Sequence, residues 1–321
     1  MDTTDISIII PSLNEESNIS ETLSEISKNK SICNPQVIIV DNGSTDRTVS
    51  IAESLGATVL IYPEASIGEL RNIGVLSAKN EIIAFIDADI TLDKKWFQEI
   101  INQKAALEKN PLILTGNRVL PPNRNFISTY WFSKLSNKKT KQNYINSGNL
   151  ITTKETFKIV GGFSQQLKTS EDYDFCQKAI KLGATINPNP NFVAWHRGYP
   201  ENIFEFIRRE SWHGSEDTRS LTNIVKSKTA LIALLNLIFF LGSIILSFAL
   251  LSVTPIAIYA IFLAVTSVSI VVLKIGTDPV SSVPASSLIA AAYLTGRSIA
   301  YVKNFGRHRA TEFSDRQATL K

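Results

Sequence analysis

The segment Glu81-Ile-Ile-Ala-Phe-Ile-Asp-Ala-Asp89 contains an unbroken apolar run that ends in two carboxylates, Asp87 and Asp89. Consecutive β-prone apolar residues are typical of a strand that is buried on both faces of a parallel sheet. Folds of this kind place their ligand groups on loops at the carboxyl ends of the strands. Paired acids there indicate a divalent cation, with one carboxylate on the ion and the other orienting its water or a sugar phosphate. A turn or helix cap would use the same residues.

Strand and helix signals alternate through the first 90 residues and predict an α/β fold. Apolar runs predict strands, and apolar spacing with capping residues predicts helices between them. The expected strands cover residues 6–10, 37–40, 58–62 and 82–86, and the expected helices cover 15–29, 46–55 and 69–78. This order implies a parallel sheet covered by helices. The chain has no Gly-x-Gly-x-x-Gly and no Walker loop, so neither device holds a nucleotide here.

Polar residues follow the first, second and fourth predicted strands, and Gly68-Glu-Leu-Arg-Asn-Ile-Gly74 lies between the second and the fourth. The first strand runs into Pro11-Ser-Leu-Asn-Glu15, and the second into Asp41-Asn-Gly-Ser-Thr-Asp46. Asp41 can accept a hydrogen bond from a base N–H, and Gly43-Ser44 can bring backbone donors to a ribose or phosphate. Arg71 can pair with a diphosphate through its planar fork. Each motif also has an ordinary explanation as a turn, a cap or a solvated helix residue.

Composition narrows the classes of protein. The net charge of +4 over 321 residues includes no continuous basic stripe, so nucleic acid is not an expected partner. Two distant cysteines, Cys33 and Cys176, match no metal spacing and suit a reducing compartment. The N-terminus carries acids where a signal peptide needs bases, so we expect the N-terminal part to fold in the cytoplasm.

Two long uncharged stretches, Leu231–Val253 and Ile256–Leu273, follow in the last third of the chain. At about 1.5 Å per residue they extend roughly 34 Å and 27 Å, which suits a hydrocarbon core of about 30 Å. A buried helical hairpin of a soluble domain is the alternative. Lysines flank the pair, so both ends are expected on the cytoplasmic side. We therefore predict a head over residues 1–225 and a membrane domain over 226–321.

The tail after Lys274 contains a weaker apolar stretch, Val283–Gly296, which is short for a crossing. A third crossing would carry the basic C-terminus outward, against the positive-inside bias. We therefore expect two crossings and an interfacial helix over about residues 283–303, whose apolar side is formed by Ala290, Ala291, Leu294 and Ile299. Three crossings remain the alternative.

The ordered motifs together resemble a known family. The runs Ser7–Glu15 and Val37–Asp46, Arg71-Asn-x-Gly74 and Asp87-Ala-Asp89 look like the family 2 glycosyltransferases of GT-A fold, whose sheet is Rossmann-like and mixed with helices on both faces. The resemblance continues through Asn146-Ser-Gly-Asn149, Val160-Gly-Gly-Phe163 and Glu171-Asp-Tyr-Asp174, and covers roughly residues 5–215.

This resemblance implies a nucleotide-diphosphate sugar donor, a Mg²⁺ or Mn²⁺ ion on Asp89, and inversion at the anomeric carbon. It also implies a catalytic base at Asp172. The expected donor-binding residues are Pro11, Asn14, Glu15, Asp41, Gly43, Ser44, Arg71, Asn72, Asp87, Ala88, Gly148 and Asn149. The expected metal ligands are Asp89, Asp87 and His196, although a packed or surface histidine is the alternative for His196.

Direct displacement needs a base opposite the leaving diphosphate and a cation to absorb its growing charge. Glu171 and Asp172 open a predicted helix, and adjacent residues cannot both aim at one acceptor hydroxyl. We assign Asp172 to the chemistry and Glu171 to a structural role. Gly148-Asn149 suits the floor of a sugar pocket, or a plain turn. The segment 124–144, with aromatics beside lysines, suits a membrane interface, an acceptor lid or a solvated loop.

The combined expectation is an inverting glycosyltransferase of the inner (plasma) membrane with a cytoplasmic head, which fits the synthesis of a cell-envelope glycan or glycolipid. It would move one sugar to a lipid-linked or membrane-proximal acceptor hydroxyl or lipid phosphate. Uridine diphosphate is favoured over guanosine diphosphate because Asp41 suits an imide N–H. The alternatives are a sugar nucleotidyltransferase and a non-catalytic sugar-nucleotide sensor with a membrane anchor. The Gln-x-x-Arg-Trp motif of processive members is missing, which argues against a long-polymer synthase.

Overall fold

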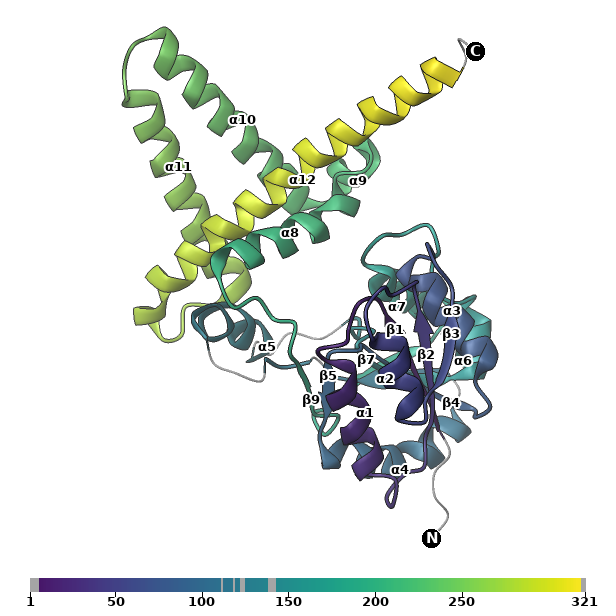
Figure 1. The fold of residues 1–321 in the computed structure, drawn as a ribbon. Helices are drawn as coiled ribbons and strands as arrows, with labels where there is room; N and C mark the ends of the chain where they lie inside the picture. Colours follow the sequence, from purple (N-terminus) through teal and green to yellow (C-terminus); the bar gives the residue numbers. More distant parts are fainter. Residues whose placement is uncertain (1–5, 111, 118, 122–124, 138–142, 319–321) are drawn as a thin grey trace. The chain divides into compact units, whose positions relative to one another are not determined.

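The computed structural model of the chain describes residues 6–110, 112–117, 119–121, 125–137 and 143–318. The chain divides into two compact units; the described residues of the first lie within 6–121 and 143–199, and those of the second lie within 125–137 and 200–318. The predicted boundary at residue 225 therefore falls inside the second unit, and residues 123–138 leave the first unit to join the second. Figure 1 shows the elements of both units.

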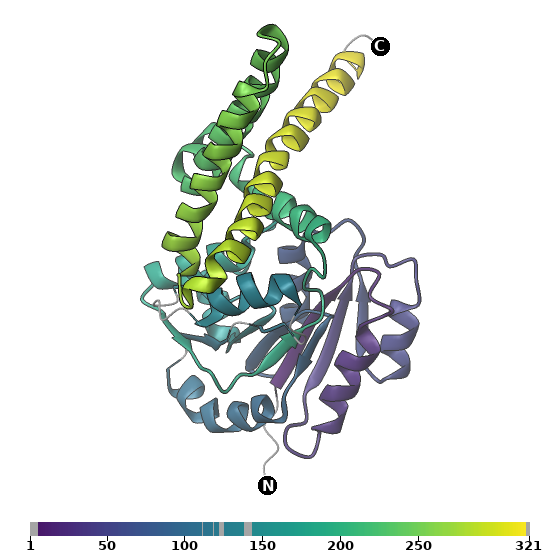
Figure 2. The same ribbon diagram turned by 90° about the vertical axis from the view of Figure 1, so that its left-hand side faces the viewer.

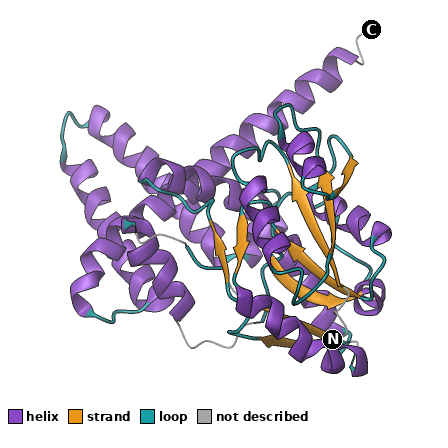
Figure 3. Cartoon of the chain, turned by 60° about the horizontal axis from the view of Figure 1, so that its bottom comes forward, coloured by secondary structure: helices purple, strands orange, loops and turns teal. Residues whose placement is uncertain are grey.

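The first unit is built around a seven-stranded sheet in the order β3-β2-β1-β4-β7-β6-β8. Figure 3 shows these strands side by side among their helices. Its strands are β1 (Ile6–Ser12), β2 (Gln36–Asp41), β3 (Thr58–Ile61), β4 (Ile82–Ile86), β6 (Ile113–Gly116), β7 (Asn149–Thr153) and β8 (Thr185–Pro188). Its helices are α1 (Ile19–Lys28), α2 (Thr48–Ser54), α3 (Ile67–Ser77), α4 (Lys94–Lys109), α6 (Lys154–Val160) and α7 (Glu171–Lys181).

The strand directions make this a mixed sheet. β3, β2, β1 and β4 are parallel, as predicted, whereas β7 runs antiparallel to both β4 and β6. The wholly parallel sheet expected from the strand and helix order is therefore wrong at β7, and the mixed α/β sheet implied by the family resemblance is confirmed. Hydropathy marks a strand but does not encode its direction, so the order of elements alone could not show this reversal.

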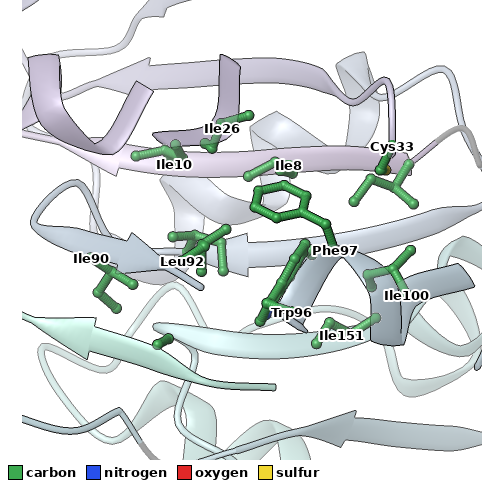
Figure 4. Close-up of a cluster of buried hydrophobic side chains, with 14 of the residues drawn as sticks. Ile8, Ile10, Ile26, Cys33, Ile90, Leu92, Trp96, Phe97, Ile100 and Ile151 are labelled. Carbon is green, nitrogen blue, oxygen red and sulfur yellow. The ribbon is translucent and has the colours of Figure 1, made fainter. Parts of the chain in front are cut away.

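The two faces of the sheet bury alternate side chains, as the period of a strand requires. Ile8 and Ile10 of β1 face the helices α1, α2 and α4, whereas Ile9 faces α3, α6 and α7. Figure 4 shows the first of these cores, where Trp96 and Phe97 of α4 pack among the sheet residues. Burial on both faces explains why the strands are continuous apolar runs.

A second, two-stranded sheet pairs β5 (Ile90–Leu92) antiparallel with β9 (Ala194–His196). Three residues, 87–89, separate β4 from β5, and the partner strand β9 comes from the far end of the unit. The pairing joins Ile90 to His196, which brings the loop of Asp87 and Asp89 beside the end of β9.

The second unit is helical. It contains η1 (Ser128–Phe132), α5 (Ser133–Asn137), α8 (Ile203–Asp217), α9 (Leu221–Lys226), α10 (Lys228–Ala249), α11 (Thr254–Ile270), η2 (Val271–Ile275), η3 (Val280–Ser282) and α12 (Val283–Ala318). Figure 2 shows α10 and α11 as a helical pair with α12 beside them. Within the described residues, Lys228–Ala249 and Thr254–Ile275 are long and apolar enough to cross a membrane.

These two apolar helices are largely exposed. In the most apolar 18 residues of each helix, only 17% are buried in Lys228–Ala249 and 11% in Thr254–Ile275. The core helix of a soluble domain would be mostly buried. The predicted interfacial helix over 283–303 is part of the longer α12. Ala290 and Leu294, expected to face the membrane interface, are instead buried in a cluster that includes residues of α8 and η1.

Candidate active site

The loop after β4 holds Asp89 against β9. The His196 imidazole Nε2 lies 3.3 Å from Asp89 Oδ1. The backbone N–H of Arg197 donates to the Asp89 carbonyl at 3.0 Å. Gly198 lies so close that a Cβ there would overlap Asp89 Oδ2. The β5–β9 pairing thus places an acid and an imidazole together although 107 positions separate them in the sequence.

Negative charge accumulates around this loop. Burial, and then the charge of Asp87, raises the pKa of Asp89 to about 6. Burial also raises the pKa of Glu15, and the charges of Asp89 and Asp87 raise it further, against a hydrogen bond from Asn18 that lowers it. Carboxyl groups whose pKa values are raised by burial and by each other's charge favour a bound cation.

The three-ligand metal site expected from Asp87, Asp89 and His196 is not assembled. The described residues contain no group of three or more His, Cys, Asp or Glu side chains arranged to hold a metal ion. Asp87 is drawn away because its Oδ1 accepts a hydrogen bond from Arg71 at 2.7 Å. Of the three expected ligands, Asp89 and His196 remain in contact with each other.

Arg71 is a buried bridge between the ends of β4 and α7. Its side chain is 2% exposed, and its two terminal nitrogens bind Asp87 Oδ1 at 2.7 Å and Glu171 Oε1 at 2.6 Å. The solvated-helix alternative for Arg71 is therefore wrong. Because breaking a buried ion pair leaves an uncompensated charge, Arg71 fixes the two acids relative to each other.

Asp172 lies next to this bridge at the start of α7. Burial and the neighbouring Glu171 raise the pKa of Asp172 to about 7, whereas Arg71 and the backbone N–H groups of Tyr173 and Ser147 lower it. Glu171 is engaged by Arg71 and by the Ser147 hydroxyl at 3.3 Å. A carboxyl group with a pKa near neutrality can both accept and release a proton, which is the property that a general base needs.

The residues at the ends of β1 and β2 form a separate hydrogen-bond network. Asp41 accepts four hydrogen bonds, from the Ser12 and Ser44 hydroxyls and from the backbone N–H groups of Gly43 and Ser44. Ser44 Oγ in turn accepts from the Asn14 backbone N–H at 2.8 Å. Since a carboxylate offers about four acceptor sites, Asp41 is saturated and orders these loops rather than offering an acceptor to a base.

Three other expected donor-binding residues have structural partners. The Asn72 side chain exchanges two hydrogen bonds with the Phe163 backbone, both at 2.9 Å. The Asn149 amide accepts from the Trp96 indole at 2.8 Å and donates to the Phe192 carbonyl at 2.9 Å. Ala88 is buried, and its carbonyl accepts from the Thr22 hydroxyl at 2.7 Å. Asn72 and Asn149 therefore hold the loops that carry the site.

Gly148 has a steric reason to be glycine. A Cβ there would lie 2.7 Å from Asp87 Oδ2 and 2.8 Å from Ile90. Residues that the sequence did not single out are Ser147, whose backbone binds Asp172, and Arg197, whose charge opposes the raised pKa of Asp89. The position of Arg197 directly after His196 was the one sequence feature that could have pointed to it.

Known proteins that are similar to this chain are glycosyltransferases. Residues 7–160 match the family model described as glycosyl transferase family 2. The chain carries a family 2 glycosyltransferase domain. An uncharacterised glycosyltransferase of Mycobacterium tuberculosis is 33% identical over 113 residues, which cover 35% of this chain and 48% of the relative. Glycosyltransferase AglE of Haloferax volcanii is 25% identical over 208 residues, which cover 61% of this chain and 67% of the relative.

A solved structure shares the fold. The mannosyltransferase PcManGT of Pyrobaculum calidifontis, in complex with GDP-Man and Mn²⁺, superposes with a TM-score of 0.56 at 18% identity, covering 92% of this chain and 86% of that one. At this identity the likeness shows the GT-A fold alone. The chain spans about half the length of the first curated relatives that it matches.

Proposed function

We propose that the protein transfers one sugar from a nucleotide-diphosphate sugar to an acceptor at a membrane, with inversion at the anomeric carbon. The observation that carries this proposal is the pair of sites that Arg71 joins. Arg71 binds Asp87, which precedes Asp89 by two residues, and Glu171, which adjoins Asp172. A displacement needs these two functions, namely stabilisation of the leaving diphosphate and a base for the attacking hydroxyl.

Asp172 is the proposed base. Its pKa near 7 keeps a substantial fraction ionised at neutral pH, while its basicity far exceeds that of an ordinary aspartate. Glu171 is committed to Arg71, so it holds the base in place and does not take the proton. For a lipid phosphate acceptor, which is already ionised, the protonated form of Asp172 would instead donate a hydrogen bond to the attacking oxygen.

Asp89 and His196 are the proposed metal-binding residues, together with oxygens of the donor. Their chemistry fits Mg²⁺ or Mn²⁺, because one carboxylate and one imidazole leave room for phosphate oxygens. The accumulated negative charge of Asp87, Asp89 and Glu15 supports a cation at this place. When bound, the ion would neutralise the charge that grows on the leaving diphosphate.

The nucleotide would lie along the loops that end β1 and β2, near Pro11, Asn14, Glu15, Gly43 and Ser44. Asp41 binds Gly43 and Ser44 there, and Ser44 binds Asn14. Because the acceptor sites of Asp41 are already occupied, Asp41 gives no reason to favour uridine over guanosine. The test therefore includes both UDP-sugars and GDP-sugars. The two apolar helices support a multi-pass anchor in the inner (plasma) membrane with a cytoplasmic head, and hence a membrane-proximal acceptor of cell-envelope synthesis.

The proposal is tested by thermal shift of the detergent-solubilised full chain against UDP-sugars, GDP-sugars and free sugars, each with Mn²⁺ or with chelator. We expect one class of nucleotide sugar to raise the melting temperature, and to do so more strongly with Mn²⁺, because a ligand stabilises the state that it binds. Stabilisation by nucleoside triphosphates in place of nucleotide sugars would favour a nucleotidyltransferase. Donor binding without any turnover would favour a sensor.

A further inference from the structure

A buried carboxylate on α4, Glu99, is held by four neutral amide groups. Glu99 is 6% exposed. Its Oε1 accepts from Gln103 Nε2 at 2.8 Å and Asn189 Nδ2 at 2.6 Å, and its Oε2 accepts from Asn191 Nδ2 at 3.1 Å and Asn102 Nδ2 at 3.4 Å. Burial raises the pKa of Glu99, but these hydrogen bonds outweigh burial and lower it below the ordinary glutamate value. Glu99 is therefore ionised at neutral pH, and its acceptor sites are in use.

Two of the four donors belong to the segment 189–193, which joins β8 to β9. Asn102 and Gln103 lie on α4 itself, whereas Asn189 and Asn191 belong to this segment. The Asn189 side chain also accepts a hydrogen bond from the Asn191 backbone N–H at 3.0 Å. Because Asn189 donates to Glu99 and accepts from Asn191, the orientation of its amide is fixed. Glu99 thus fastens the start of the segment to α4 at two points.

The end of the same segment is also held at the start of α4. The backbone N–H of Asp93, the N-cap of α4, donates to the Val193 carbonyl at 3.1 Å. The Trp96 ring packs edge-on against Phe192, with 5.8 Å between the ring centres. α4 follows directly after β5, and the segment 189–193 leads directly into β9. One helix therefore joins the approaches to both strands of the small sheet.

The β5–β9 ladder needs this support because it is very short. It joins three residues on each strand, and on its other side β9 meets only an isolated bridge to Leu120 among the described residues. So small a ladder is weakly stable alone, and a slip of one residue would turn every side chain to the opposite face. In the observed register Ile90 pairs with His196, and His196 Nε2 lies 3.3 Å from Asp89 Oδ1. A slip would separate the imidazole from Asp89.

We propose that Glu99 is a positioning residue: it fastens the segment 189–193 to α4 and so sets the register of β9, which places His196 beside Asp89. A carboxylate suits this role because it offers about four acceptor sites and no donor. Glutamine has the same size, but it replaces one acceptor oxygen with a donor NH₂ that faces other donors. The claim about β9 concerns structure alone, and only its consequence for metal-dependent donor binding rests on the proposed function.

The structural claim is tested by hydrogen exchange of the detergent-solubilised full chain without any ligand. The readout is the backbone N–H of His196, which donates to the Leu120 carbonyl, and that of Arg197, which donates to the Asp89 carbonyl. In Glu99→Gln we expect both amides to exchange at least about tenfold faster, because the ladder opens more often. Gln103→Leu is the matched control. It removes a hydrogen bond to Glu99 without touching the segment, and should leave both rates within about twofold.

Pairing can also be restored by exchange of the two groups. Adding Asn189→Asp to Glu99→Gln lets the new amide donate to a carboxylate, and should return the exchange rates toward those of the wild type. If Glu99→Gln does not fold, Asn191→Ala removes one of the two contacts to the segment and should still accelerate exchange by about threefold. Unchanged exchange in the variant that folds would overturn the proposal, as would equal acceleration in Gln103→Leu.

The functional consequence is measured by calorimetric titration of the nucleotide sugar with Mn²⁺ and with chelator. Glu99→Gln should weaken Mn²⁺-dependent binding by about tenfold or more, and the double variant should recover most of this loss. Faster exchange with undiminished donor affinity would overturn the positioning role of Glu99. A wild type that binds no nucleotide sugar would instead contradict the proposed function, and the exchange rates would still decide whether Glu99 sets the register of β9.

Discussion

Asp89 and Asp172 are both buried carboxyl groups with raised pKa values, but their neighbours give them different roles. Asp87 raises the pKa of Asp89 beside an imidazole, which suits a cation. Glu171 raises the pKa of Asp172 beside an arginine, which suits proton transfer. Groups of one type whose environments differ in this way are typical of active sites.

Asp89→Ala is expected to abolish cation-dependent donor binding, because the donor's phosphates would then face Asp87 and Glu15 with no held counter-ion. Calorimetric titration of the donor with Mn²⁺ and with chelator measures this effect. Glu108→Ala, which removes an exposed acid paired with Lys104 on α4, is the control and should bind the donor normally. Wild-type, Mn²⁺-dependent affinity in Asp89→Ala would remove Asp89 from the site.

Asp172 also makes a prediction about stability. Its folded pKa of about 7 lies above the usual aspartate value of about 3.9, so the folded protein holds this proton more tightly than the unfolded chain does. Its contribution to stability is therefore present at low pH and is lost as pH rises from about 4 through 7.

Asp172→Asn removes this titration. The variant should match the wild type in stability near pH 4 and exceed it at pH 8 by on the order of a few kcal/mol. Thermal denaturation at both pH values measures the difference. A variant that is less stable than the wild type at pH 8 would show that the ionised Asp172 is stabilising in the folded protein.

The pairing of β5 with β9 is the element that completes the metal side of the site. β9, at Ala194–His196, ends in the histidine that lies beside Asp89. Its partner could not be predicted, because the pairing joins positions far apart in the sequence. The loop after β9 must also approach closely, and Gly198 permits this.

Gly198→Ala should therefore weaken Mn²⁺-dependent donor binding by about tenfold or more, since Asp89 must move to admit the new methyl group. Gly242→Ala on α10 is the matched control, because a Cβ there meets open space. Donor affinity by calorimetry and folding by circular dichroism separate displacement of Asp89 from loss of structure. Unchanged donor affinity in Gly198→Ala would show that the position of Asp89 is not critical.

Local sequence patterns predicted some features of the structure and missed others. The four parallel strands and the acids at their ends followed from local patterns, since the apolar runs and the polar residues after them are adjacent in the chain. The saturation of Asp41, the diversion of Asp87 to Arg71 and the structural roles of Asn72 and Asn149 did not follow. Each depends on a partner that the fold brings from elsewhere, and a local pattern does not record such a partner.

The chain combines a GT-A unit with a helical unit, and fewer features of the helical unit could be predicted from the sequence. Two apolar helices were expected and are present. The segment 124–144 was open between a membrane interface, a lid and a solvated loop. Its described residues include η1, where Trp131 is buried against Phe206 and Tyr293, so a plain solvated loop is wrong there. Lys138, Lys139 and Lys141 lie outside the described residues.

Two crossings predict that both ends of the chain lie in the cytoplasm. A cysteine at Thr319, which lies outside the described residues, should resist an impermeant thiol reagent in intact cells and react after permeabilisation. Cys33 and Cys176 are buried and would be replaced in the background. Labelling of intact cells would indicate a third crossing and would contradict the prediction of two crossings.

The assignment of Asp172 as the base is tested most directly by measuring sugar transfer by Asp172→Asn. The donor is the one that the thermal-shift panel identifies, and the acceptor carries a hydroxyl. Asparagine keeps the size of the side chain but cannot take a proton. The account predicts that the rate of sugar transfer falls by on the order of 10²–10⁴ while the donor dissociation constant stays within about twofold. Transfer at the wild-type rate would contradict the assignment of Asp172 as the base, and a large loss of donor affinity would show that Asp172 is a structural acid.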